Sequence, residues 1–289
     1  MIRPGSLLGA IEGESLKMLR RPAIYVLGII LLAILVLVSY LLGWLFLTFP
    51  PAGTRFPQGV TAADLKKAFY PINMVRQALS NAAVLGGVLA LILGVLTVGS
   101  EYGWGTLKTI LTQRPARLEV FLAKFVTVAA TLVVFAVLNL AAAAVMSVLL
   151  GLADQQSLAF PDAIQIVTGL GTTWLIWSWY AAFGGFLAYC FRQSALAIGI
   201  GLAYLLVIDT LVFGVIAQLG VTILQTVERF FPGPNAMALI QSFGNATPAA
   251  AQNVPRPIAG PWQATIVLLL YLLATLVVSA ILLRSRDVT

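Results

Sequence analysis

Apolar residues fill six long runs of the chain, and short polar intervals separate them. Each run reaches the roughly 20 residues that a helix needs to cross the hydrocarbon core of a bilayer. The runs cover about 23–49, 77–99, 120–150, 164–190, 194–218 and 262–283. The pattern predicts an all-α membrane protein with six transmembrane helices in a single transmembrane domain, residues 1–289. Because only residues 191–193 separate the fourth and fifth runs, these two helices should form a tight hairpin.

The first 22 residues form an amphipathic segment. Leu7, Leu8 and Ile11 begin an apolar face that Met18 and Leu19 continue, with Ser15 between them. Glu14, Lys17 and Arg21 lie on the opposite face. This predicts a helix that lies in the headgroup layer, in contact with membrane lipids. An ordinary polar tail is the alternative.

The interval Ser100–Lys124 is the most polar one between two long runs. As a helix, it places Trp104, Leu107 and Leu111 on one face and Lys108 on another. Pro115 ends this helix or starts the next one, because it lacks a backbone donor. A short helix of this kind on a basic side of the membrane favours a docking function, and anchoring to anionic lipid is the alternative.

Composition excludes several classes of protein. Hydrophobic residues make up 60% of the chain and charged residues 9%, whereas soluble domains carry about 25% charged residues. With one cysteine, Cys190, and no histidine, the chain has almost no ligands for a zinc, haem or iron–sulfur site, so no metal is expected. No phosphate-binding P-loop motif occurs. We therefore expect an integral membrane protein without catalytic residues, and no nucleic acid partner.

The placement of basic residues indicates the orientation. With a cytoplasmic N-terminus, eleven of the 17 Lys and Arg residues lie inside and six lie outside. The inner residues are Arg3, Lys17, Arg20, Arg21, Lys108, Arg114, Arg117, Lys124, Arg192, Arg284 and Arg286. This bias follows the positive-inside rule, and six crossings return the C-terminus to the cytoplasm. The prediction is a multi-pass protein of the cell inner (plasma) membrane with both termini cytoplasmic.

Two of the predicted outer loops are long. In loop 50–76, Thr61 and Asp64 have the spacing of a capping box, which predicts a short external helix. Loop 219–261 is apolar but broken by Pro232 and Pro234. It is typical of one or two short helices that dip into the outer leaflet, with a partly disordered loop as the alternative.

Two predicted spans carry small residues at intervals of four. They are Ala82, Gly86, Ala90 and Gly94 in the second span and Ala195, Gly199 and Ala203 in the fifth. Small faces allow helices to approach closely in lipid. The spacing leaves two interpretations open, which are packing within one subunit and packing at a dimer interface.

Asp209 is the one charged residue deep inside an apolar run. A bare carboxylate is unfavourable there, so it must face another span, a wet cavity or the outer surface, or be protonated. The sequence leaves two roles open for Asp209, which are lining a transport path and serving as a hydrogen-bonded structural carboxyl. The aromatic residues Trp174, Trp177, Trp179 and Tyr180 of the fourth span likewise fit a hydrophobic pathway, core packing or an interface belt.

The residues after the second span carry a family resemblance. The sequence Glu101-Tyr-Gly-Trp-Gly105-Thr106-Leu107-Lys108, continuing through Leu111, Arg114, Pro115 and Arg117 to Lys124, resembles permease subunits of the ABC type-2 exporter family. The spacing Glu14-x-x-Lys17-x-x-Arg20 before the first span and the six apolar runs are similar too. The bulky Trp104 and the long loop 50–76 depart from the usual pattern.

The resemblance implies a function and partners. Such permeases pair with a second copy or a close homologue and bind two cytoplasmic ABC ATPase subunits, which carry the ATP and Mg. No cofactor is then bound by this chain. The segment of about 101–115 would be the coupling helix that docks into the ATPase, and spans 2 and 5, with Asp209, would border the dimer interface or the pathway. Substrate does not follow from the resemblance.

Two other classes remain open at this stage. One is a membrane scaffold or immunity protein that binds a partner without moving a substrate. The other is an ion-coupled secondary carrier, which one buried Asp and no visible internal repeat argue against.

Overall fold

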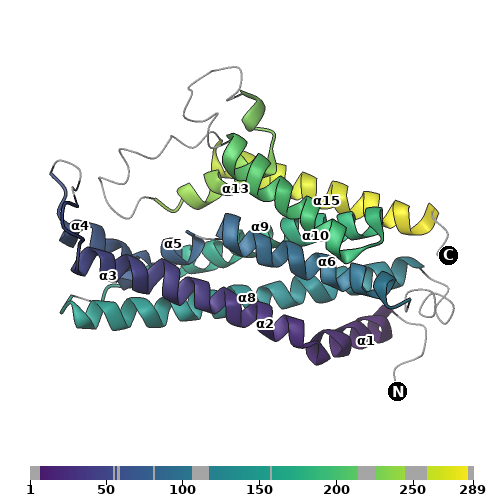
Figure 1. Ribbon diagram of the computed structural model, residues 1–289, viewed down its shortest axis with the longest axis horizontal. Coiled ribbons are helices and arrows are strands. Elements are labelled where there is room, and N and C mark those ends of the chain that lie inside the picture. The colour runs from purple at the N-terminus through teal and green to yellow at the C-terminus, as the bar shows by residue number, and fades with distance from the viewer. Residues whose placement is uncertain are drawn as a thin grey trace.

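The structure is a computed structural model that describes residues 7–54, 56, 59–80, 82–105, 117–156, 158–213, 226–244 and 259–285. Every regular element among them is helical (Figure 1). The first half contains α1 (Leu7–Arg20), α2 (Pro22–Ala33), η1 (Ile34–Leu42), α3 (Gly43–Thr48), α4 (Ala62–Lys66), η2 (Lys67–Phe69), η3 (Pro71–Asn73), α5 (Met74–Leu79), η4 (Ala82–Gly86) and α6 (Gly87–Gly103). The second half contains α8 (Arg117–Ala153), α9 (Ala163–Phe191), α10 (Ser194–Ala203), η5 (Tyr204–Val212), α13 (Pro232–Gln241) and α15 (Pro261–Ser285).

Four helices in the described part of the chain are long and apolar enough to cross a membrane. They are Pro22–Thr48, Ala82–Gly103, Arg117–Ala153 and Pro261–Ser285. The segment Ser194–Asp209 is a shorter apolar helix, and α9 has 29 residues. The all-α class and the membrane-spanning character are thus confirmed for these residues, and the count of six crossings stays a prediction.

The helix α9 occupies the centre of the bundle and contacts α6 along its length (Figure 1). Its side chains Trp177, Trp179 and Tyr180 are buried in the main core, so these three aromatic residues are core residues. Gly94 of α6 meets the backbone of α9 so closely that an added Cβ would overlap the carbonyl group of Ala181. The α6–α9 pair is therefore held by backbone approach, as small residues in lipid permit.

Polar groups between the helices find partners on their neighbours. The Asn139 amide donates to the carbonyl of Ala78 at 3.1 Å, and the Tyr40 hydroxyl lies 2.8 Å from the Ser147 hydroxyl. The Trp177 indole donates to the carbonyl of Ala82 at 3.0 Å. Without water, such groups are stable only when paired, which fixes the rotation of each helix against the next.

The predicted capping box is confirmed. Thr61 and Asp64 exchange hydrogen bonds at the start of α4. Asp154, at the end of α8, then ties this loop to the bundle. It accepts from the Trp44 indole at 2.9 Å and the Tyr70 hydroxyl at 3.2 Å, and it pairs with Lys66 at 3.5 Å.

The tight hairpin is also present, because α9 ends at Phe191 and α10 begins at Ser194. Arg192 makes the turn in the left-handed region, with φ 54°. In the loop predicted to contain broken helices, α13 includes Pro232 and Pro234 in its first turn, where proline has no hydrogen bond to lose. Residues 219–225 and 245–258 of that loop lie outside the described residues.

Candidate functional site

Three helices meet at the end of the bundle that carries α1 (Figure 1). α6 ends there at Gly103, and α8 begins there at Arg117. α1 lies across α8, and Pro22 starts α2 directly after it. Because a proline is tolerated at the first position of a helix, the chain turns from α1 into its first span at this point.

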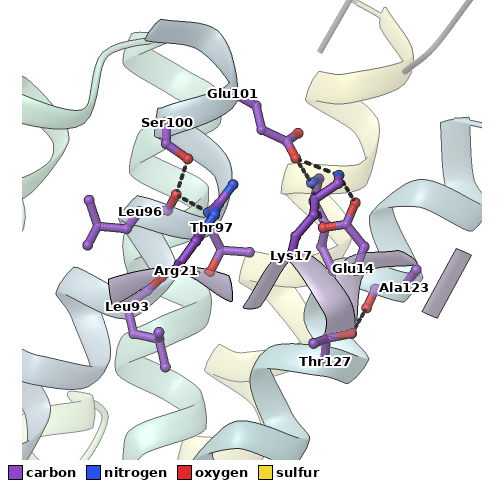
Figure 2. A network of polar contacts seen from close by, with 11 residues as sticks. Glu14, Lys17, Arg21, Leu93, Leu96, Thr97, Ser100, Glu101, Ala123 and Thr127 are labelled. Carbon is purple, nitrogen blue, oxygen red and sulfur yellow. Dashed lines mark hydrogen bonds and ion pairs between the residues drawn. The ribbon is translucent and has the colours of Figure 1, made fainter. Parts of the chain in front are cut away.

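Four charged side chains form what we call the ion-pair cluster: Glu14 and Lys17 of α1, Glu101 of α6 and Lys124 of α8. The Lys124 ammonium contacts Glu101 at 2.5 Å and Glu14 at 3.1 Å. The Lys17 ammonium contacts Glu14 at 2.6 Å and Glu101 at 3.1 Å. Figure 2 shows Lys17 reaching between the two carboxylates. Each ammonium bridges both acids, so the cluster joins all three helices.

The cluster is buried and electrically balanced. The side chain of Lys124 is 1% exposed and that of Glu101 is 2% exposed, whereas Lys17 at the rim is 38% exposed. Two carboxylates face two ammonium groups, so the net charge is zero. Buried charges are tolerated when they are paired, and removing one partner from such a pair typically destabilises a protein by about 3–5 kcal/mol.

The pKa values at α1 follow from this pairing. Burial raises the pKa of Glu14, but Lys124 and Lys17 outweigh it and hold that pKa below its ordinary value. Burial lowers the pKa of Lys17, but Glu101 and Glu14 outweigh it and hold that pKa above its ordinary value. Both groups are therefore charged around neutral pH, and the cluster is a set of ion pairs.

Two arginines attach further elements to this end of the bundle. Arg21 donates to the carbonyl of Leu96 on α6 at 3.2 Å (Figure 2), and its guanidinium lies 5.3 Å from the ring centroid of Trp104. Arg117 donates to the carbonyls of Leu283 at 3.1 Å and Arg284 at 3.4 Å. The last turn of α15 is thereby fixed to the first residue of α8.

The structure describes only the two ends of the predicted coupling segment. Glu101 is buried in the cluster, Gly105 adopts φ 65°, and Arg117 begins α8. The residues between them that were predicted to contact an ATPase lie outside the described residues: Thr106, Leu107, Lys108, Leu111, Arg114 and Pro115. Their role stays a prediction.

The placement of Glu14 differs from the sequence interpretation. The amphipathic pattern put it with Lys17 and Arg21 on a polar face, but in α1 it is buried together with Ala10 and Met18. Leu8 and Leu19 are exposed instead. The reason is that Lys124, 110 residues away, supplies a buried counter-charge. Arg20 is exposed.

The two small-residue faces have different surroundings. Ala82, Gly86, Ala90 and Gly94 are all buried within this chain, and an added Cβ on Gly86 would overlap the Trp177 indole. Packing within one subunit accounts for that face. Ala195, Gly199 and Ala203 are exposed, and nothing lies within 4 Å of a Cβ built on Gly199. Whether either face borders a dimer interface or a pathway stays a prediction.

Asp209 lies in η5 with neighbours that can bind a carboxylate. The Tyr180 hydroxyl donates to it at 3.2 Å, and Tyr204 and the backbone of Gly233 also donate to it. Gly233 is in the first turn of α13, where free N–H groups and the helix dipole favour an anion. This geometry matches a hydrogen-bonded structural carboxyl, which is one of the two roles that the sequence left open for Asp209. The other role, in a transport pathway, stays a prediction.

Sequence reasoning did not identify Lys124 as a buried residue. It lies inside an apolar run, seven residues after Arg117. Its helical neighbours Ala123, Thr127 and Val128 are buried as well. A lysine on the buried face of a predicted span requires a carboxylate partner, so Lys124 within its apolar run was a signal that an acidic residue lies beside it. No group of three or more His, Cys, Asp or Glu that could hold a metal occurs in the described part of the chain.

The fold and the buried ion pairs define a multi-pass, all-helical membrane protein. The family described as ABC-2 family transporter protein matches residues 10–208. This range covers more than half of the chain, so the protein belongs to that family and is a permease component of an ABC transporter. The matched range includes most of α1 and all of α6 and α8, and it contains all four residues of the ion-pair cluster. Comparison with curated proteins found no match.

Proposed function

We propose that this permease is coupled to a separate cytoplasmic ABC ATPase and exports a substrate across the cell inner membrane. The observation that carries the proposal is the ion-pair cluster. It fixes both ends of the segment between α6 and α8 to each other and to α1. A segment held in this way transmits a displacement to the helices on which it is mounted.

The residues of that segment have distinct expected roles. Lys108 and Arg114 bind acidic or carbonyl groups of the ATPase, and Leu107 and Leu111 fill an apolar groove on it. Arg117 is attached to the end of α15, so it passes movement on to the last helix. ATP and Mg bind to the partner, and no cofactor is bound by this chain.

The mechanism is a population shift between two arrangements of the bundle. ATP binding closes a pair of ATPase subunits and pulls on the segment. The ion-pair cluster moves α1, α6 and α8 as one unit, and a cleft that is open to the cytoplasm shifts to one that is open outward. Paired charges suit this role because a low-dielectric site holds them rigidly.

We infer the topology from the order of the helices and the position of a second copy from an exposed face. We infer six crossings, with α9 and α10–η5 as the fourth and fifth and both termini in the cytoplasm. α1 and the end of α15 lie at the same end of the bundle, which is consistent with this topology (Figure 1). A second permease copy would pack on the exposed face of Ala195, Gly199 and Ala203.

The test is ATPase activity of the assembled complex in nanodiscs. We expect Lys108→Glu with Arg114→Glu to abolish binding of the ATPase and to lower turnover at least tenfold. Arg20→Glu is the matched control, because it reverses an exposed basic residue of α1 that is not part of the ion-pair cluster. Full assembly and turnover in the Lys108→Glu, Arg114→Glu protein would exclude coupling through this segment. Stable assembly without any substrate transport would favour a scaffold.

A further inference from the structure

An apolar pocket lies between α8, α9 and α15. Its volume is about 270 Å³. Phe121 and Leu132 of α8 form buried walls, and Leu272 and Leu276 of α15 close the opposite side. No charged side chain lines it. The pocket is separate from the ion-pair cluster, because Lys124 points to Glu14 and Glu101 instead.

One polar group in the pocket wall has no partner. Ser178 of α9 lines the pocket, is 7% exposed, and its hydroxyl oxygen has no hydrogen bond. Several other buried hydroxyls on the described helices donate to the carbonyl four residues earlier, as Thr173 does at 2.9 Å and Thr127 at 2.8 Å. Since a buried hydroxyl without a partner is unfavourable, Ser178 is suited to a hydrogen bond with a ligand.

The pocket opens sideways. Leu122 and Val126 at its rim are 41% and 47% exposed, and they lie on the membrane-spanning helix Arg117–Ala153. The surface around the opening is therefore covered by lipid, and a ligand reaches the pocket from within the bilayer. At about 30 Å³ for each atom the size of a water molecule, the volume accommodates about nine heavy atoms, and the end of a slightly longer chain extends through the opening.

From these features we propose that the pocket between α8, α9 and α15 binds a neutral aliphatic molecule from the bilayer, of about ten carbon atoms, whose single oxygen hydrogen-bonds to Ser178. The apolar lining excludes charged ligands, which could not be desolvated there without a partner. The oxygen of the ligand forms a hydrogen bond with the Ser178 hydroxyl, and the aliphatic part of the ligand takes the place of lipid at the rim of the pocket. The site does not depend on the ATPase or on transport.

The experiment uses the full chain in nanodiscs and a photoreactive diazirine analogue of 1-decanol. We expect saturable labelling of peptides from α8, α9 and α15, and competition by 1-decanol at lower membrane concentration than by decane. Ala129→Phe fills the pocket and should reduce labelling at least fivefold. The control Val134→Phe changes an exposed residue of the same helix and should leave labelling unchanged.

Ser178→Ala tests the hydrogen bond. It should weaken competition by 1-decanol about three- to tenfold, as expected for one hydrogen bond, and leave competition by decane unchanged. Leu276→Phe fills the pocket from α15 and replaces Ala129→Phe if that variant does not fold. Labelling spread evenly over lipid-facing helices, labelling that survives both filling variants, or equal losses for decanol and decane in Ser178→Ala would overturn the proposal.

Discussion

Removing the charge of Lys124 is the most direct test of the ion-pair cluster. In Lys124→Met, the two carboxylates Glu14 and Glu101 keep only Lys17, and the buried net charge changes from zero to −1. At an effective dielectric constant of about 20, a pair of unit charges 3.1 Å apart attracts by about 5 kcal/mol. Desolvation of Lys124 offsets much of this, so we expect a net loss of about 3–5 kcal/mol in unfolding free energy.

A second substitution separates charge imbalance from lost packing. In the double variant Lys124→Met with Glu101→Met, Glu14 and Lys17 still pair at 2.6 Å and the cluster is neutral. We expect this variant to recover most of the lost stability, because buried ion pairs exchanged for apolar residues are often neutral in effect. The two single losses should therefore fail to add, by at least about 2 kcal/mol.

The assay is unfolding in mixed micelles followed by tryptophan fluorescence. Lys67→Met is the control, because Lys67 pairs with Asp64 at 2.8 Å in an exposed position. Its expected effect is below about 1 kcal/mol. If Lys124→Met is no more destabilising than Lys67→Met, or if the Lys124 and Glu101 losses simply add, the cluster is not a coupled buried network.

Three further outcomes follow from the structure. Gly94→Ala should destabilise the protein by about 1–3 kcal/mol, because the added Cβ would overlap the backbone of α9. Gly199→Ala is the control and should change thermal stability little, because nothing lies near its Cβ. Equal effects of the two substitutions would contradict the α6–α9 contact. Because the pKa of Glu14 is held below its ordinary value of 4.5, its stabilising contribution is present above pH 4.5 and is lost as the pH falls through its folded pKa. Glu14→Gln should flatten the stability profile below pH 4.5, and an unchanged profile would show that Glu14 is not paired. Thr61→Ala should destabilise α4 by about 1 kcal/mol, seen as faster hydrogen exchange of the Asp64 amide, and unchanged exchange would show that the capping box contributes nothing.

Features that depend only on residues close together in the chain could be predicted from the sequence. The predicted run 164–190 and the helix Ala163–Phe191 differ by one residue at each end. A long apolar stretch in lipid must pair its own backbone groups, so it forms a helix wherever it is placed. The hairpin at Arg192 and the capping box at Thr61 likewise need only a few adjacent residues.

The packing inside the bundle could not be predicted from local sequence patterns. The small-residue spacing of Ala82–Gly94 fitted a dimer interface as well as an internal contact, and only the position of α9 showed the internal contact. The second span also begins differently from its apolar run, because α5 ends at Leu79 and the helix resumes at Ala82. The periodicity of apolar residues shows which face of a helix is apolar, but it does not show which neighbouring helix covers that face.

From the sequence alone it was possible to predict a helical membrane protein, the approximate positions of its apolar helices, and the basic segment between two of them. Those properties follow from length, hydropathy and local capping. The tertiary structure decided that Glu14 turns inward to Lys124, that α6 and α9 touch through their backbones, and that Ser178 faces a pocket without a partner. Such features join residues that are tens to more than a hundred positions apart, and only packing brings them within the few ångströms over which ion pairs and hydrogen bonds act.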